Sequence, residues 1–179
     1  LVSTQGPPAT VYRFDASGNY IGEFTSETGS NGLNFPFALD VSNDGEVFIF
    51  DVDISDLNNR ISKIKVYDEQ GNFLRSWGDF GDGPGQFDNA IRLSIAKTGE
   101  IYVIEEGEVE VEVYDKFGTL INQWMVPSNK LSGASGITDI FHFQGRVYVS
   151  LFAEPVEQVK VFNEQGKFLF EFGELGFAE

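Results

Sequence analysis

The stretch that decides the fold is Val66-Tyr67-Asp68-Glu69-Gln70-Gly71-Asn72-Phe73-Leu74, because the chain repeats it. Close copies stand at 113–121 (VYDKFGTLI) and 161–169 (VFNEQGKFL), and a looser copy stands at 13–21 (RFDASGNYI). Each copy places an aromatic residue before an Asp- or Asn-led turn that a glycine closes, which is typical of a tight β-hairpin. The turn glycines follow one another at intervals of 53, 47 and 48 residues: Gly18, Gly71, Gly118 and Gly166. A period of this size, built of hairpins, indicates a repeat architecture.

A second kind of hairpin alternates with the first. Its copies are LDVSNDGEVFI (39–49), LSIAKTGEIYV (93–103) and TDIFHFQGRVYV (138–149). Two hairpins per repeat make a four-stranded antiparallel blade, which is the unit of a β-propeller. The sequence therefore predicts an all-β fold, a propeller of four-stranded antiparallel blades.

The repeats also predict how the chain is divided. Residues 1–10 read as an extended lead-in, and 11–179 read as a partial propeller with a half blade at 11–24 and blades at about 35–77, 88–124 and 134–172. A glycine-rich joint, WGDFGDGPGQF (77–87), links the first full blade to the next. The half blade lacks inner strands in this chain, and 172–179 begin another joint. We therefore expect an incomplete ring that absent residues or another chain would complete, since a blade is buried by its neighbours on both faces.

The first full blade and its joint resemble the NHL-repeat family. The resemblance rests on Asn59-Arg60-Ile61, on Val66-Tyr67-Asp68, on Gly71-Asn72-Phe73-Leu74 and on GDGPGQF at 81–87. The chain is similar also to the six-bladed propeller proteins of bacterial cell envelopes. It departs from the family where Phe35-Pro36-Phe37-Ala38 replaces the usual Pro-x-Gly-hydrophobic run. The resemblance implies the propeller fold and leaves the function open, because propellers carry many unrelated functions.

The composition narrows the range of partners. The chain has 28 acidic and 12 basic residues, which gives a formal charge of −16. Phosphate backbones and anionic lipids repel such a chain, so we expect no nucleic-acid partner and favour a protein with a basic surface. No apolar run approaches the roughly 18–20 residues of a transmembrane helix, so we expect no membrane insertion. Strong acidity, few lysines and the absence of cysteine favour an extracytoplasmic location (secreted, periplasmic or cell-surface).

The first candidate site is the acidic stretch DVDISDLNN at 51–59. It lies where the first full blade has 26 residues between its turn glycines, against 19 and 21 in the other two. Its candidate ligands are the oxygen-bearing side chains of Asp51, Asp53, Asp56 and Asn58. Such side chains could bind a hard cation, and we consider a Ca²⁺ site at Asp51, Asp53 and Asp56. The alternatives are a contact with a partner protein and a solvated loop with Asx turns.

The second candidate site is the run EEGEVEVEV at 105–113. A strand with period two places Glu108, Glu110 and Glu112 on one face and the valines on the other. Aligned like charges repel, so the face should be solvated or should meet a basic partner. A solvated outer strand is the favoured interpretation, and a docking stripe is the alternative.

Catalytic chemistry finds little support in the sequence. His142 is the only histidine, it lies between two phenylalanines on an expected strand, and we assign no catalytic residue and no cofactor other than the possible Ca²⁺. We therefore predict a non-catalytic protein-binding and scaffolding module. The alternative is a metal-dependent lyase or hydrolase whose active site lies largely in blades outside this chain. RNA binding, as in some NHL proteins, would need a basic face, and the charge argues against it.

Overall fold

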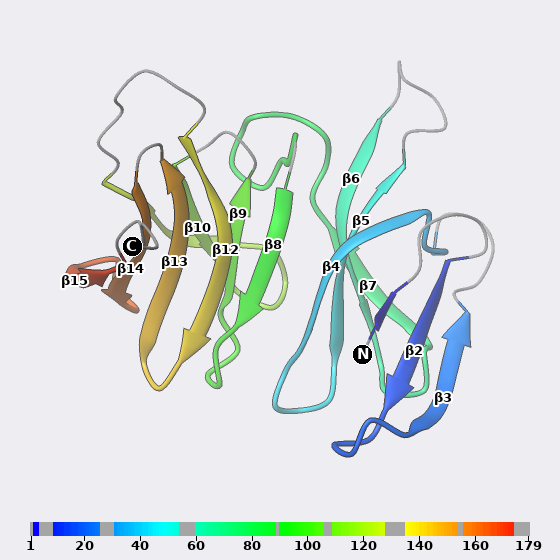
Figure 1. The fold of residues 1–179 in the computed structure, drawn as a ribbon. Coiled ribbons are helices and arrows are strands. Elements are labelled where there is room, and N and C mark those ends of the chain that lie inside the picture. Colours follow the sequence, from blue (N-terminus) through cyan, green and yellow to red (C-terminus); the bar gives the residue numbers. More distant parts are fainter. Residues whose placement is uncertain are drawn as a thin grey trace. The chain divides into compact units, whose positions relative to one another are not determined.

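The structure is a computed structural model that describes residues 2–3, 9–25, 31–53, 60–88, 90–105, 109–127, 135–153 and 156–173. Every regular element in these ranges is a β-strand, and the strands form one three-stranded and three four-stranded antiparallel sheets (Figure 1). The predicted propeller of four-stranded blades is thus confirmed. Every ladder among the described strands stays within one sheet, and none of them closes a ring.

The three-stranded sheet has the order β1-β2-β3 and consists of β1 (Val2–Ser3), β2 (Thr10–Phe14) and β3 (Tyr20–Thr25). Blade A consists of β4 (Phe35–Val41), β5 (Val47–Asp53), β6 (Ile61–Tyr67) and β7 (Phe73–Trp77). Blade B consists of β8 (Ala90–Ile95), β9 (Ile101–Glu105), β10 (Glu110–Tyr114) and β11 (Leu120–Met125). Blade C consists of β12 (Ser135–Phe143), β13 (Arg146–Ala153), β14 (Val156–Asn163) and β15 (Phe168–Phe172).

The N-terminal sheet has one strand more than the sequence indicated. Val2 and Ser3 lie opposite Tyr12 and Val11, so β1 adds to the side of β2 that faces away from β3. This strand falls within the lead-in at 1–10. A ladder of two residue pairs is too short to leave a periodic pattern in the sequence, which explains why the pattern indicated only two strands there.

The second strand of blades A and B is buried on both of its faces. In β5 all residues from Val47 to Val52 are buried, and in β9 all residues from Ile101 to Ile104 are buried. Such strands read as unbroken apolar runs rich in β-branched and aromatic residues, because both faces must be covered. The outer strands β7 and β11 instead alternate between half-buried and exposed residues.

The repeated hairpin turn has the same hydrogen bonds in each copy. In the turn after β6, the N–H of Gly71 donates to the carbonyl of Asp68 over 3.0 Å, and Gly71 has a φ of 87°. The Asp68 carboxylate accepts from the N–H groups of Gln70 and Asn72 at 2.9 and 2.8 Å. Only glycine adopts this φ without strain, which explains its place in every copy.

The joint after blade A folds back onto its own blade. Phe87 is fully buried, and its ring centroid lies 5.8 Å from that of Trp77 and 5.6 Å from that of Phe50. A Cβ on Gly78 would lie 2.6 Å from the Phe87 ring, so a side chain there would displace the ring. The Gln86 amide oxygen accepts from the N–H of Gly83 at 3.1 Å, which closes the glycine-rich loop.

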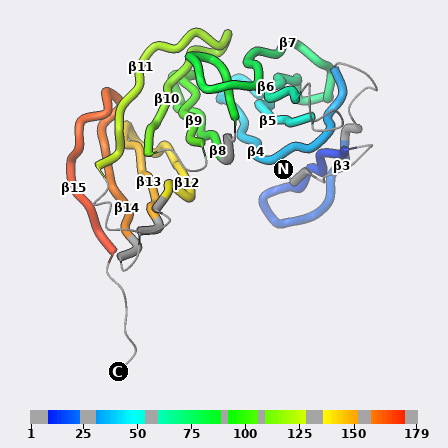
Figure 2. Tube along the Cα trace, turned by 90° about the horizontal axis from the view of Figure 1, so that it is seen from above, coloured from blue at the N-terminus to red at the C-terminus, as the bar shows by residue number. Residues whose placement is uncertain are grey.

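The chain divides into two compact units, 1–88 and 89–179. The first unit packs the three-stranded sheet against blade A, with Val11, Val47, Ile49 and Tyr67 in its core. The second unit packs blade B against blade C through a larger core, in which Trp124 lies against buried aliphatic residues. Within each unit the strands follow the chain order across their sheets (Figure 2). The described part of the chain contains no helix with the length and hydrophobicity to cross a bilayer.

Candidate functional site

Asp51 lies at the end of β5, where the acidic stretch begins, and its side chain points into the protein. The carboxylate is 1% exposed and lies 2.9 Å from Nζ of Lys65, which is 5% exposed. It also accepts from the N–H of Asn34 at 2.9 Å. Nζ of Lys65 donates in addition to the carbonyl of Gly32. The pair therefore joins β5, β6 and the segment that leads into β4.

Burial decides the electrostatics of this pair. Loss of solvent raises the pKa of Asp51 above its ordinary value, and the Lys65 ammonium and the N–H groups of Asn34 and Phe35 counter that rise only in part. A buried carboxylate that is bonded on several sides is a fixed structural element. Asp51 thus anchors the start of the acidic loop and is not part of its solvent-exposed surface.

The connection that follows Asp51 is the longest of its kind. Residues 54–60 lie between β5 and β6, whereas 106–109 lie between β9 and β10 and only 154–155 between β13 and β14. Asp53, at the end of β5, is half-buried and forms interactions of its own. Asp56 and Asn58 lie outside the described residues. Among the residues that the structure describes, no three potential metal ligands of the His, Cys, Asp or Glu type lie together. The Ca²⁺ site stays a prediction.

The glutamates of β10 alternate with buried valines, as period two requires. Glu110 accepts from Nε2 of Gln123 in β11 at 3.0 Å, and Glu112 accepts from the hydroxyl of Tyr114 at 2.7 Å. Partial burial raises the pKa of Glu112, the Tyr114 hydrogen bond lowers it, and the charge of Glu110 raises it further. Glu108 lies outside the described residues. Glu110 and Glu112 are therefore bonded within their own blade.

His142 lies at the packing interface between blades B and C. Its side chain is 5% exposed, and its Nε2 lies 3.0 Å from Oε1 of Glu164. Its ring stacks on Tyr102 of blade B with centroids 5.4 Å apart, and its backbone N–H donates to Oγ of Ser94 at 2.9 Å. The only histidine thus holds two blades together.

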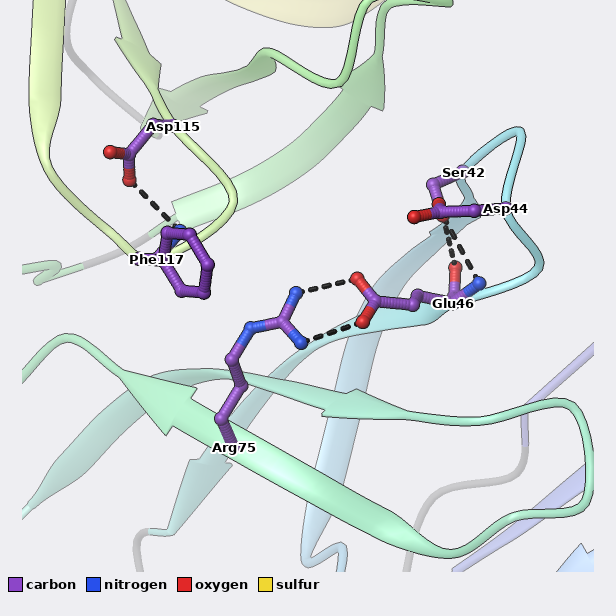
Figure 3. A network of polar contacts seen from close by, with 6 residues as sticks. All are labelled: Ser42, Asp44, Glu46, Arg75, Asp115 and Phe117. Atoms are coloured by element: carbon purple, nitrogen blue, oxygen red, sulfur yellow. Dashed lines mark hydrogen bonds and ion pairs between the residues drawn. The ribbon is translucent and has the colours of Figure 1, made fainter.

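Two basic residues beside the candidate site form ion pairs that no sequence motif indicated. Lys65 is one of them. The other is Arg75 of β7, which forms a bidentate pair with Glu46 at 2.7 and 2.5 Å (Figure 3). Beside it, Oγ of Ser42 donates to Asp44 at 2.5 Å in the turn before β5. The sequence did hold a signal for Lys65, which lies at an inward position of the apolar strand ISKIKVY (61–67). A charge at such a position requires a partner, because a buried unpaired charge is costly.

Comparison with curated proteins supports the NHL resemblance. The chain is 32% identical to NHL repeat-containing protein 3 of Mus musculus over 102 residues, and 30% identical to the Homo sapiens protein over the same length. These matches cover 54% of this chain and 28% of either relative. No protein-family model matches the chain. The chain has a β-propeller fold and is similar to NHL-repeat proteins over about half of its length, and it spans a little over a quarter of the length of the curated relatives it matches.

Solved structures of similar fold are propellers with different functions. A gluconolactonase from Xanthomonas campestris matches with a TM-score of 0.65 and 19% identity, over 97% of this chain and 58% of that chain. A nidogen/laminin complex matches with a TM-score of 0.63 and 11% identity, over 96% and 62%. An inactive virginiamycin B lyase from Staphylococcus aureus, with quinupristin, matches with a TM-score of 0.59 and 12% identity, over 97% and 55%. At these identities the likeness concerns the fold alone.

Proposed function

We propose that the chain is a non-catalytic binding and scaffolding part of a β-propeller whose blades present loops to a partner protein. The observation that carries the proposal is the buried Asp51–Lys65 pair, which fixes the end of β5 just before Asp53 and the connection 54–60. A loop on a rigid base loses less conformational freedom on binding than a loop on a mobile one. The formal charge of −16 favours a basic partner surface and speeds encounter with it.

In this proposal the partner protein contacts residues that follow Asp51, and Asp51 itself is not part of the contact. The Asp51 carboxylate is 1% exposed, so the acids that a partner could meet are Asp53 and Asp56. The low lysine content and the acidity favour a location outside the cytoplasm. The incomplete ring also fits a need for further blades, from absent residues or from another chain.

The alternative is a propeller enzyme, and similar folds carry both kinds of function. The gluconolactonase and the lyase are enzymes, while the nidogen/laminin structure is a complex between proteins. Fold alone does not select between them. The burial of Asp51 and His142 favours the non-catalytic function. Both side chains form bonds to neighbouring segments of the protein itself and so have a structural role.

The test compares two variants of equal charge on binding to poly-L-lysine, a basic probe. Asp53→Asn/Asp56→Asn removes one charge at the end of β5 and one in the β5–β6 connection. Asp44→Asn/Glu69→Gln removes two charges in the β4–β5 and β6–β7 turns, which lie at the opposite ends of these strands (Figure 1). We expect the first variant to weaken binding at least severalfold at low salt and the second to change it little. Biolayer interferometry at two ionic strengths gives the measurement.

Equal weakening by the two variants would mean that the probe reads only net charge, and the loop proposal would then be wrong. Unchanged urea midpoints for both variants serve as the folding control. Turnover of a lactone or a streptogramin by the purified chain would favour the enzyme alternative instead.

A further inference from the structure

Asn31 and Gly32 precede β4 in the first unit, and together they form a pair that occurs nowhere else in the chain. Of all the asparagines in the sequence, only Asn31 is followed directly by glycine. The backbone nitrogen of the residue after an asparagine can attack Cγ of the asparagine side chain, and a cyclic imide forms. Glycine has no Cβ to hinder that approach, so this pair is the one in the chain most open to the reaction.

Two side chains of β6 hold the carbonyl groups on either side of the Gly32 nitrogen. The Tyr67 hydroxyl donates to the carbonyl of Asn31 at 2.7 Å, and Nζ of Lys65 donates to the carbonyl of Gly32. Both donors are fixed in place, because Tyr67 and Lys65 are buried. Gly32 is itself buried, whereas Asn31 is half-buried. The nitrogen that would attack therefore lies between two anchored carbonyl groups.

The two residues that follow the pair are held as well. Leu33 is buried in the core of the first unit, in one cluster with Val11 and Ile49. The N–H of Asn34 donates to the Asp51 carboxylate at 2.9 Å. We call residues 31–34 the anchored segment. Each of its residues has a contact that fixes it to blade A or to the core of the first unit.

The folded state withholds what the reaction needs. The Gly32 nitrogen attacks only after its proton has passed to a base from solvent, and Gly32 is buried. Solvent reaches a buried backbone N–H through local opening, which costs free energy. Opening of the anchored segment has to break the hydrogen bonds of Tyr67 and Lys65. These bonds therefore set how often the pair becomes reactive.

In the opened form the reaction needs only water. The Gly32 nitrogen forms a bond to Cγ of Asn31, and the side-chain nitrogen leaves as ammonia after taking up one proton, which balances the proton that Gly32 gave up. Water then opens the imide to aspartate or to isoaspartate, in which the backbone runs through the former side chain. Isoaspartate lengthens the backbone by one carbon atom, and either product adds a carboxylate to a chain of net charge −16.

We propose that Asn31 is a modification site at which deamidation proceeds only from an opened form of the anchored segment. The isoaspartyl product keeps the segment from closing again, because a lengthened backbone cannot place both carbonyl groups on Tyr67 and Lys65. The modification thereby removes one acceptor from Lys65, which also pairs with Asp51. This site goes beyond the loop function proposed above and does not depend on it.

The test incubates the 179-residue chain at mildly alkaline pH and follows the conversion of amide to acid at Asn31 by peptide mass mapping. We expect the rate in native buffer to be about tenfold or more below the rate in denaturing urea, because opening costs free energy. Tyr67→Phe removes only the hydroxyl and should raise the native rate about 3–10-fold, the effect of one hydrogen bond, without changing the rate in urea. Tyr114→Phe makes the same change at the equivalent position of blade B, opposite Leu120 as Tyr67 lies opposite Phe73, and should leave both rates unchanged.

Three results would overturn the proposal. They are equal rates in native buffer and in urea, a native rate that Tyr67→Phe and Tyr114→Phe change equally, and a deamidated chain that keeps the urea midpoint of the parent. Ion exchange isolates the deamidated chain. Asn31→Asp is its control and should lower the midpoint less, because it adds the charge without lengthening the backbone. If Tyr67→Phe does not fold, the parent rates in native buffer and in urea still decide. Failure of poly-L-lysine binding would leave this result standing, because the anchored segment includes neither Asp53 nor Asp56.

Discussion

At the scale of single residues, the buried Asp51–Lys65 pair decides how the end of β5 is held. Lys65→Met would leave the Asp51 carboxylate 1% exposed and without its cation. We expect a loss of about 3–5 kcal/mol in the free energy of unfolding, which is typical when one partner of a buried pair is removed. Urea denaturation measures the loss. Lys63→Met makes the same change two residues away on β6, at a half-buried position, and should cost under about 1 kcal/mol.

The double variant Asp51→Leu/Lys65→Met separates the cost of a broken pair from the worth of an intact one. Apolar replacement of both partners often costs less than removal of one, so the double variant should be more stable than Lys65→Met. A double variant less stable than Lys65→Met would show that the hydrogen bonds to Asn34 and Gly32 outweigh the charges.

At the scale of the elements, the carboxylates of the hairpin turns contribute to the dependence of stability on pH. Hydrogen bonds from Asn19 lower the pKa of Asp15 below 3.8, and hydrogen bonds from Asn72 do the same for Asp68. Hydrogen bonds from Thr119, first its backbone N–H, lower the pKa of Asp115. A carboxylate whose pKa falls on folding stabilises the fold above the unfolded pKa, and that contribution is lost as pH falls through the folded pKa.

We therefore expect the free energy of unfolding to decline below about pH 4, where the unfolded carboxylates take up protons first. Asp68→Asn/Asp115→Asn should make this decline shallower, because an amide accepts the same hydrogen bonds without titrating. Asn163, which already accepts from Gln165 and Lys167, shows that an amide fits the turn. Urea denaturation between pH 6 and pH 2.5 gives the slopes. A steeper decline in the Asn variant would contradict the role assigned to these two carboxylates. Asn163→Asp should make the decline of the parent chain steeper.

At the scale of the whole molecule, the excess of 28 acidic over 12 basic residues creates self-repulsion in the folded state. Salt screens charges beyond about 10 Å at 0.1 M. We expect the melting temperature to rise by a few degrees between low salt and 0.5 M NaCl, measured by circular dichroism at low protein concentration. Glu69→Gln/Asp82→Asn, at two exposed positions, should reduce this rise. A melting temperature that falls with salt would show that attractive ion pairs such as Glu46–Arg75 dominate instead.

The repeat pattern alone determined the fold class, the blades and the hairpin turns. Period two, turn glycines and an aromatic residue before each turn are local signals, and each blade pairs strands that are neighbours in the sequence. The alternation of Glu110 and Glu112 with buried valines followed from the same local rule. The ladder of Val2 and Ser3 did not, because two residue pairs leave no period to read.

Only the tertiary structure decided the roles of the charged residues. Asp51 reads as one acid in an acidic loop, yet its partner Lys65 lies on the next strand and its other bonds reach back to residues before β4. His142 likewise acquires its role from Ser94 and Tyr102 in another blade. Contacts between segments far apart in the sequence fix burial and ion pairing, and no local pattern carries them.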